Sequence, residues 1–240
     1  MTGAIQCAVT RSEVTFWESV AKTRWGAYAT GVEERVIRQA AALAAPPGQA
    51  LEIGCDGGRW SKMLADFGWK MTCIDVNRET LAICQRRVPG ARCILASPKD
   101  DKVACESASL SLLLCVEVVP VIQSHWFLGE ACRALKDGGV LVGVWWNAAS
   151  WRGLMFRLKS LVRGRSESYY TRAYAPWRTQ LLKAGLRLVH EEGFCWGPFG
   201  RASDSPLVPL FVRSEQMLGL RRLPAISPWI AFIAKKSGAV

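Results

Sequence analysis

The stretch that decides the fold reads Leu51-Glu52-Ile53-Gly54-Cys55-Asp56-Gly57-Gly58-Arg59-Trp60. A short apolar run ends here in a glycine-rich turn, and apolar residues then recur at helical spacing as far as Phe67. Such a turn lets the backbone pass close to a ligand, and the first turn of the following helix offers it free N–H groups. The stretch therefore predicts a ligand-binding strand–turn–helix unit.

Strands and helices are expected to alternate along the residues that follow. Apolar runs predict strands at 70–75, 91–96, 110–116 and 140–146, and helical spacing predicts helices at 78–87 and 124–135. One helix is expected over residues 13–45, ended by Pro46-Pro47-Gly48. Alternation with short links is typical of a parallel, doubly wound α/β sheet.

Asp75 closes the second expected strand, 23 residues after Glu52. A carboxylate at that place can accept hydrogen bonds from both ribose hydroxyls of an adenosine. The spacing does not fit a dinucleotide fingerprint, because Asp56 stands where G-x-G-x-x-G needs its second glycine. The pattern thus favours an adenosine-containing ligand other than NAD.

Two further blocks agree with this pattern: Leu113-Leu114-Cys115-Val116-Glu117-Val118 and Ala134-Leu135-Lys136-Asp137-Gly138-Gly139-Val140-Leu141. Together with the turn and Asp75, they resemble the class I S-adenosylmethionine-dependent methyltransferases, in the small-molecule branch that includes the ubiquinone and menaquinone enzymes. The resemblance covers residues 48–146, and residues 227–236 resemble the closing antiparallel strand of that family. It implies a Rossmann-like, mostly parallel seven-stranded sheet with helices on both faces and an inserted substrate lid.

The resemblance also implies roles for individual residues. S-adenosyl-L-methionine is the implied cofactor, and its expected contacts are Glu52, Gly54, Cys55, Asp56, Gly58, Asp75, Val76, Ser97 and Cys115. Asp100 or Asp101 is an alternative to Ser97 at the adenine amino group, and Gly57 is an alternative to Asp56 as the residue with special backbone geometry. Candidates for a general base are Glu117, His125 and His190.

Charge divides the chain into two parts. Residues 1–150 carry a net charge of +1, whereas residues 151–240 carry +10. We expect a helical segment over the cofactor site (1–48), the cofactor-binding core (49–147), a basic, aromatic lid with a late strand (148–215), and a closing strand and tail (216–240). The basic region 151–172 predicts contact with a membrane surface or another anionic partner.

The 9 cysteines are expected to be buried, reduced thiols. No two form a C-x-x-C pair and the two histidines stand apart, so no metal site is expected. The first ten residues do not read as a secretory signal, and a cytoplasmic protein, peripheral to the membrane at most, is expected.

The sequence leaves four functions open. The first is methyl transfer to a small or lipid-linked acceptor, at oxygen or carbon. The second is a methyltransferase-like binding protein whose activity is impaired by Asp56. The third is an NAD-type dehydrogenase, and the fourth a nucleic-acid methyltransferase, which only the basic second half favours.

Overall fold

The computed structural model describes residues 14–163 and 169–238. Its strands are β1 (Gln49–Ile53), β2 (Lys70–Asp75), β3 (Arg92–Leu95), β4 (Leu110–Cys115), β5 (Leu135–Trp146), β6 (Leu186–Phe194) and β7 (Trp229–Lys236). Its helices are α1 (Phe16–Ala21), α2 (Arg24–Leu43), α3 (Arg59–Asp66), α4 (Arg78–Arg87), α5 (Val119–Ile122), α6 (Phe127–Ala134), α7 (Trp151–Arg163), α8 (Tyr174–Lys183) and α9 (Val208–Met217), with a short 3-10 helix at Leu220–Arg222.

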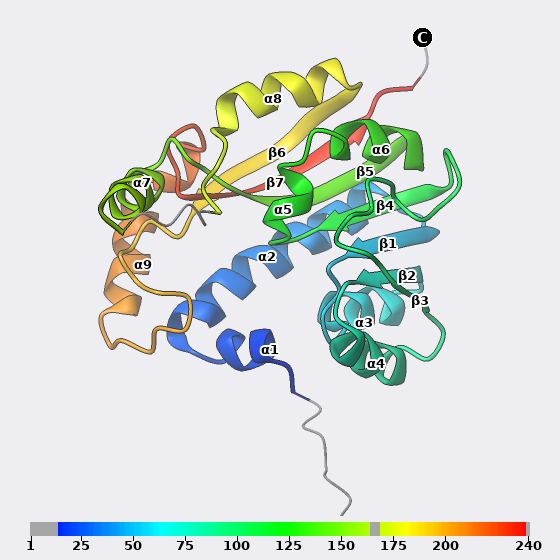
Figure 1. Cartoon of the computed structure of the whole chain (residues 1–240), viewed down its shortest axis with the longest axis horizontal. Helices are drawn as coiled ribbons and strands as arrows, with labels where there is room; N and C mark the ends of the chain where they lie inside the picture. Colours follow the sequence, from blue (N-terminus) through cyan, green and yellow to red (C-terminus); the bar gives the residue numbers. More distant parts are fainter. Residues whose placement is uncertain (1–13, 164–168, 239–240) are drawn as a thin grey trace, which may run out of the picture.

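The strands form one seven-stranded sheet in the order β3-β2-β1-β4-β5-β7-β6 (Figure 1). Strands β1 to β5 pair in parallel, while β7 runs antiparallel to both β5 and β6. This is the predicted Rossmann-like sheet. The strand order switches sides at β1, with β2 and β3 on one side and β4 and β5 on the other. The turns after β1, β2 and β4 therefore meet at the carboxyl edge, where such folds bind ligands.

Each face of the sheet buries its own hydrophobic cluster. On one face, apolar residues of α2, α3 and α4 pack against alternate residues of the strands, including Val36, Leu64 and Leu112. On the other face, α6 and α8 cover the sheet through residues such as Phe127 and Trp177. Strands that are almost wholly apolar, such as β4, in which all six residues are buried, are the expected result of coverage on both faces.

Three predicted elements differ from the structure. The helix expected over 13–45 is broken at Lys22–Thr23, because Thr15 and Thr23 each cap a separate helix through their side-chain oxygens. The helix expected over 124–135 is shorter, and an additional turn of helix with Pro120 at its start precedes it from Val119. In the region expected as the lid (148–215), helix α9 begins at Val208, which the sequence pattern did not indicate.

Candidate functional site

The turn after β1 is held tightly against β2. The backbone N–H groups of Gly54 and Cys55 donate to the Ile74 carbonyl, at 2.7 and 3.1 Å. Gly58 has φ +79°, and a Cβ there would lie 2.6 Å from the Cys84 sulfur. Glycine is therefore required at position 58 both by backbone conformation and by the close approach of α4.

Asp56, rather than Gly57, carries the special backbone geometry. Its φ is +48°, in the left-handed region that Asp tolerates better than most residues. Its carboxylate accepts a hydrogen bond from the Thr15 hydroxyl, so α1 is anchored on the turn. Burial raises the pKa of this carboxyl, while the bonds from Thr15 and the Gly57 backbone oppose the rise. The Asp56 side chain thus holds the start of α1 against the turn.

Asp75 and Val76 lie beside this turn, where their side chains could contact an adenosine. One Asp75 oxygen accepts the N–H of Asp56 and the other that of Asn77, both at 2.8 Å, so two backbone groups fix the carboxylate. Val76 is 58% exposed, which leaves an apolar surface free to pack on an adenine ring. Ser97 is exposed after β3, and its N–H donates to the Asp100 carboxylate at 2.8 Å. These residues fit the predicted cofactor.

Three of the predicted cofactor contacts have buried side chains. Glu52 is 3% exposed and its carboxyl accepts the Ser61 hydroxyl at 2.5 Å; burial raises its pKa to about 8. Cys55 is buried under the turn, and Cys115 lies in the core cluster beneath α6 and α8. Glu52 and Cys115 lie on covered strands, whose residues alternate between two buried faces, so their side chains point into the core. That these three residues contact the cofactor stays a prediction.

Glu117 lies at the carboxyl edge after β4 and forms an ion pair with Arg201. Its backbone φ is +61°, and its Oε1 has no hydrogen-bond partner among the described residues. The Arg201 guanidinium lies over three rings, with its carbon 4.5, 5.1 and 5.7 Å from the ring centroids of Trp17, Trp229 and Trp146. We call Arg201 and these three tryptophans the Arg201 cage. A cation among tryptophan faces is attracted by their π-electrons.

A second carboxylate, Glu33 on α2, is close enough to act on Arg201. Glu33 is 3% exposed; burial raises its pKa, and the charges of Arg201 and Arg59 oppose the rise. Burial in turn lowers the pKa of Arg201 to about 10, against the charge of Glu33. The site therefore combines a cation, two carboxylates and tryptophan rings beside the cofactor turn.

The sequence patterns did not single out the cage. Trp17 and Arg201 come from chain segments 184 residues apart, so no local spacing links them. The sequence pattern could have singled out Glu33, because it lies on the apolar stripe of α2. Ala29, Val36 and Ile37 stand at positions i−4, i+3 and i+4 from it. A charged residue on a buried helix face is uncommon and indicates a polar partner.

The two histidines lie apart from this site. His125 is exposed between α5 and α6. His190 lies on the edge strand β6, opposite Ile233, which is four residues along β7 from Trp229. Of the three candidates for a general base, the structure brings only Glu117 together with the cofactor turn, since both lie at the carboxyl edge.

Comparison with known proteins identifies the family of this core. Residues 51–143 match the family model for the methyltransferase domain. Residues 51–143 thus form a methyltransferase domain of the class I, S-adenosylmethionine-dependent kind. The match spans the turn, Asp75 and Glu117, and S-adenosylmethionine is the cofactor of this methyltransferase.

Solved structures share the fold of this methyltransferase at low sequence identity. A candidate S-adenosylmethionine-dependent methyltransferase from Listeria monocytogenes is 14% identical, with a TM-score of 0.62 over 88% of this chain and 99% of its own. An S-adenosylmethionine-dependent methyltransferase from Mesorhizobium loti is 16% identical, with a TM-score of 0.59 over 90% of this chain and 100% of its own. A chain from a complex between the Haloferax volcanii Trm112 methyltransferase activator and a candidate methyltransferase is 15% identical, with a TM-score of 0.57 over 90% and 96%. A comparison with curated protein sequences finds no match.

Proposed function

We propose that this methyltransferase transfers the methyl group of S-adenosylmethionine to oxygen or carbon of a small amphipathic acceptor, as in the quinone branch that its motifs resemble. The observation that carries the proposal is the Arg201 cage, with Glu117 ion-paired to Arg201, at the same sheet edge as Asp75. Its tryptophan rings suit an apolar acceptor body, and its charged pair suits a hydroxyl or enol group.

Asp75, Val76 and the turn at Gly54–Gly58 would hold the cofactor. When bound, it supplies a methyl group that is electrophilic because it is attached to a sulfonium. The protein's own part is to place the acceptor in line and to exclude water. Glu117 would accept the proton of the acceptor hydroxyl, and the Arg201 guanidinium would stabilise negative charge on the acceptor oxygen.

Ligand binding tests the first half of the proposal. Calorimetric titration with S-adenosylmethionine, S-adenosylhomocysteine and NAD is expected to give binding of both adenosyl ligands and none of NAD. Asp75→Ala should weaken adenosyl binding by about 1–3 kcal/mol, the cost of losing hydrogen bonds to a charged group. Asp66→Ala, on the exposed side of α3, serves as the matched control. Absence of adenosyl binding, restored by Asp56→Gly, would instead support the impaired binding protein.

Product formation tests the second half. The protein is incubated with methyl-labelled cofactor and a small-molecule extract, and labelled products are separated and identified. Glu117→Gln and Arg201→Ala should abolish the labelled product while S-adenosylhomocysteine affinity is retained. His125→Asn and His190→Asn test the other two candidate bases and should leave the product unchanged. Retention of the product in Glu117→Gln, or its loss in either histidine variant, contradicts the assignment of Glu117.

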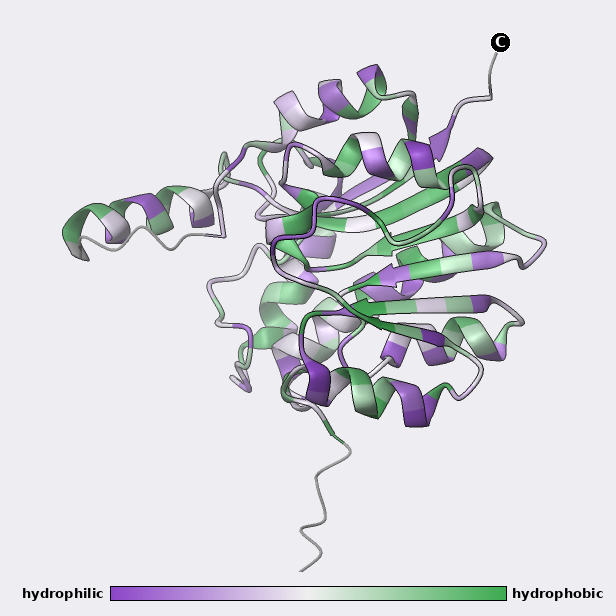
Figure 2. Cartoon of the chain, turned by 45° about the vertical axis from the view of Figure 1, so that its right-hand side comes forward, coloured by the Kyte–Doolittle hydropathy of each residue, from purple (hydrophilic) through white to green (hydrophobic). Residues whose placement is uncertain are grey.

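We further propose that α7 brings the protein to an anionic lipid surface, which would suit a lipid-linked acceptor. Figure 2 shows α7 projecting from the body with apolar and polar residues along its length. Its exposed apolar residues include Leu158, Leu161 (82%) and Val162 (87%), and Arg157 and Lys159 lie among them. Within the described residues, no helix has the length and apolar character needed to cross a bilayer.

Vesicle sedimentation tests this contact. We expect binding to vesicles containing phosphatidylserine, weaker binding to phosphatidylcholine alone, and loss of binding in Leu161→Asp. Leu182→Asp on α8, where the leucine is 65% exposed, is the matched control and should bind like the unchanged protein. Equal binding by the two variants would contradict a role for α7.

A further inference from the structure

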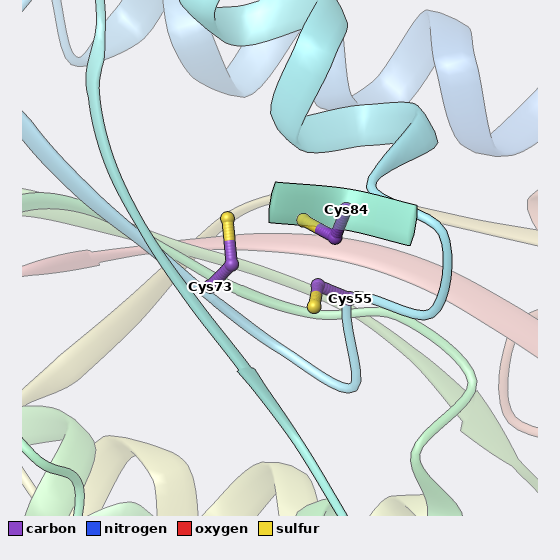
Figure 3. A group of neighbouring side chains, drawn as sticks. All are labelled: Cys55, Cys73 and Cys84. Atoms are coloured by element: carbon purple, nitrogen blue, oxygen red, sulfur yellow. The ribbon is translucent and has the colours of Figure 1, made fainter. Parts of the chain in front are cut away.

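Three cysteines meet beneath the cofactor turn. Cys55 lies in the turn itself, Cys73 on β2 and Cys84 on α4, and all three are buried (Figure 3). Their sulfur atoms lie within 4.8 Å of one another, and all three are free thiols. Figure 3 shows the side chains grouped between the turn, β2 and α4, with the Cys84 sulfur directed toward Cys73. The methyl-transfer chemistry proposed above uses none of them.

The fold brings these residues together. Parallel pairing of β1 with β2 places Ile53 opposite Ile74, so the turn that follows β1 lies beside Cys73. Helix α4 then packs back on the sheet and presents Cys84 to Gly58. A fourth thiol, Cys93 on β3, is the register partner of Cys73 and is half-buried. Four different elements supply the thiols, which is why no sequence spacing indicated a site.

We propose that Cys55, Cys73 and Cys84 form a binding site for a thiophilic metal ion of the Zn²⁺ class, with Cys93 as the fourth ligand. Metal–thiolate bonds of about 2.3 Å in a tetrahedral site place the sulfurs roughly 3.8 Å apart, which the observed group reaches with small side-chain rotations. Thiolates select soft ions over Mg²⁺ and Ca²⁺, which require oxygen ligands. The thiols release their protons to solvent as they bind.

The neighbouring groups are compatible with such an ion. The Cys73 thiol already contacts the Ser61 hydroxyl at 3.0 Å, which in turn donates to Glu52. Glu52 is not part of the group whose ligand atoms lie within 4.8 Å of one another. An ion held by Cys55 and Cys84 would tie the turn to α4 at the point where Gly58 already touches Cys84. Because an ion that binds only the folded chain stabilises it, loading should raise the melting temperature.

Cadmium titration tests the site, since thiolate-to-cadmium charge transfer gives an ultraviolet absorption that other ligands lack. The reduced, metal-free protein is titrated with Cd²⁺ and, separately, with Zn²⁺ followed by gel filtration and metal analysis. We expect one tightly held ion per chain and a rise in melting temperature. Cys55→Ala, Cys73→Ala and Cys84→Ala should each lower the affinity at least 100-fold, and Cys93→Ala about 10-fold or more.

Cys105→Ala and Cys132→Ala are the matched controls, because these thiols lie outside the group and are half-buried. They should bind the ion like the unchanged protein. Circular dichroism of each metal-free variant shows whether it is folded, and only folded variants are compared. Retention of the ion in folded Cys73→Ala, or loss in Cys132→Ala, would overturn the proposal, as would failure of the unchanged protein to hold an ion. None of these outcomes depends on whether methyl transfer occurs.

Discussion

The cofactor half and the late region of the chain, residues 147–228, are held together by different contacts. In the cofactor half, the turn at Gly54–Gly58 is fixed by backbone packed directly on β2 and α4. In the late region, long side chains reach across to backbone carbonyls: Arg152 donates to the carbonyls of Cys195, Gly197 and Phe199. Close backbone packing requires glycines at fixed places, whereas side-chain bridges leave no regular pattern in the sequence.

The largest effect is expected at Asn147, where the late region begins. Asn147 is fully buried, and its amide makes four hydrogen bonds: it donates to the carbonyls of Ala225 and Ser227 and accepts the N–H groups of Ala149 and Tyr174. Asn147→Ala should lower the free energy of unfolding by about 4 kcal/mol, roughly 1 kcal/mol for each buried partner left unpaired. Urea unfolding measures this.

Asn77→Ala is the matched substitution in the cofactor half. Asn77 is exposed and caps α4 by accepting the N–H groups of Glu79 and Thr80, so its loss should cost only about 1 kcal/mol. If the two asparagine variants lose the same stability, the late region does not depend on Asn147 as its contacts indicate.

Gly58→Ala, in the cofactor half, should have the next largest effect at a fixed pH. The left-handed φ and the contact with Cys84 together should cost about 2–3 kcal/mol in unfolding free energy. S-adenosylhomocysteine affinity should fall as well, because the turn shifts, whereas Asn147→Ala should leave that affinity near its original value. Gly90→Ala, where no neighbouring atom would lie within 4 Å of the new Cβ, is the control. Equal loss in Gly58→Ala and Gly90→Ala would contradict the packing argument.

The same difference explains what could be predicted from the sequence. The five parallel strands, Asp75 and the turn were predictable, because apolar runs and glycines report local geometry directly. The cage was not, because Arg201 meets Trp17 and Glu117 only through the tertiary fold. The break before α2 and the helix α9 were missed, since a threonine cap and a short amphipathic helix give weak sequence signals.

Glu52 offers a test that depends on pH. Burial raises its pKa from 4.5 to about 8, so the folded chain keeps a proton that the unfolded chain releases. The contribution of Glu52 to the free energy of unfolding should therefore be greatest below about pH 4.5 and should decrease as the pH rises toward 8. Glu52→Gln should reduce the difference in unfolding free energy between pH 5 and pH 8 by about 3.5 kcal/mol. The exposed Glu106→Gln serves as control, and an unchanged pH profile in Glu52→Gln would mean that the carboxyl is charged when folded.

The smallest effect concerns α1, which joins the cofactor turn to the cage. Thr15 caps α1 in a box with Glu18, and its hydroxyl also donates to the Asp56 carboxylate. Thr15→Ala should cost about 1 kcal/mol, whereas Thr15→Ser keeps the hydroxyl and should cost less. Asp56→Gly relieves the left-handed backbone but removes the same hydrogen bond, so its net effect should lie within about 1 kcal/mol of zero.

The two substitutions together measure the link between α1 and the turn. If Thr15 and Asp56 act through their shared hydrogen bond, Thr15→Ala should cost less in the Asp56→Gly background, and the double-mutant cycle should give a coupling of about 0.5–1 kcal/mol. The cycle is read by urea unfolding and again by S-adenosylhomocysteine affinity. Additive effects in both would mean that α1 lies over the turn without being held by it. Trp17 would then reach the Arg201 cage independently of the cofactor site, because α1 carries Trp17.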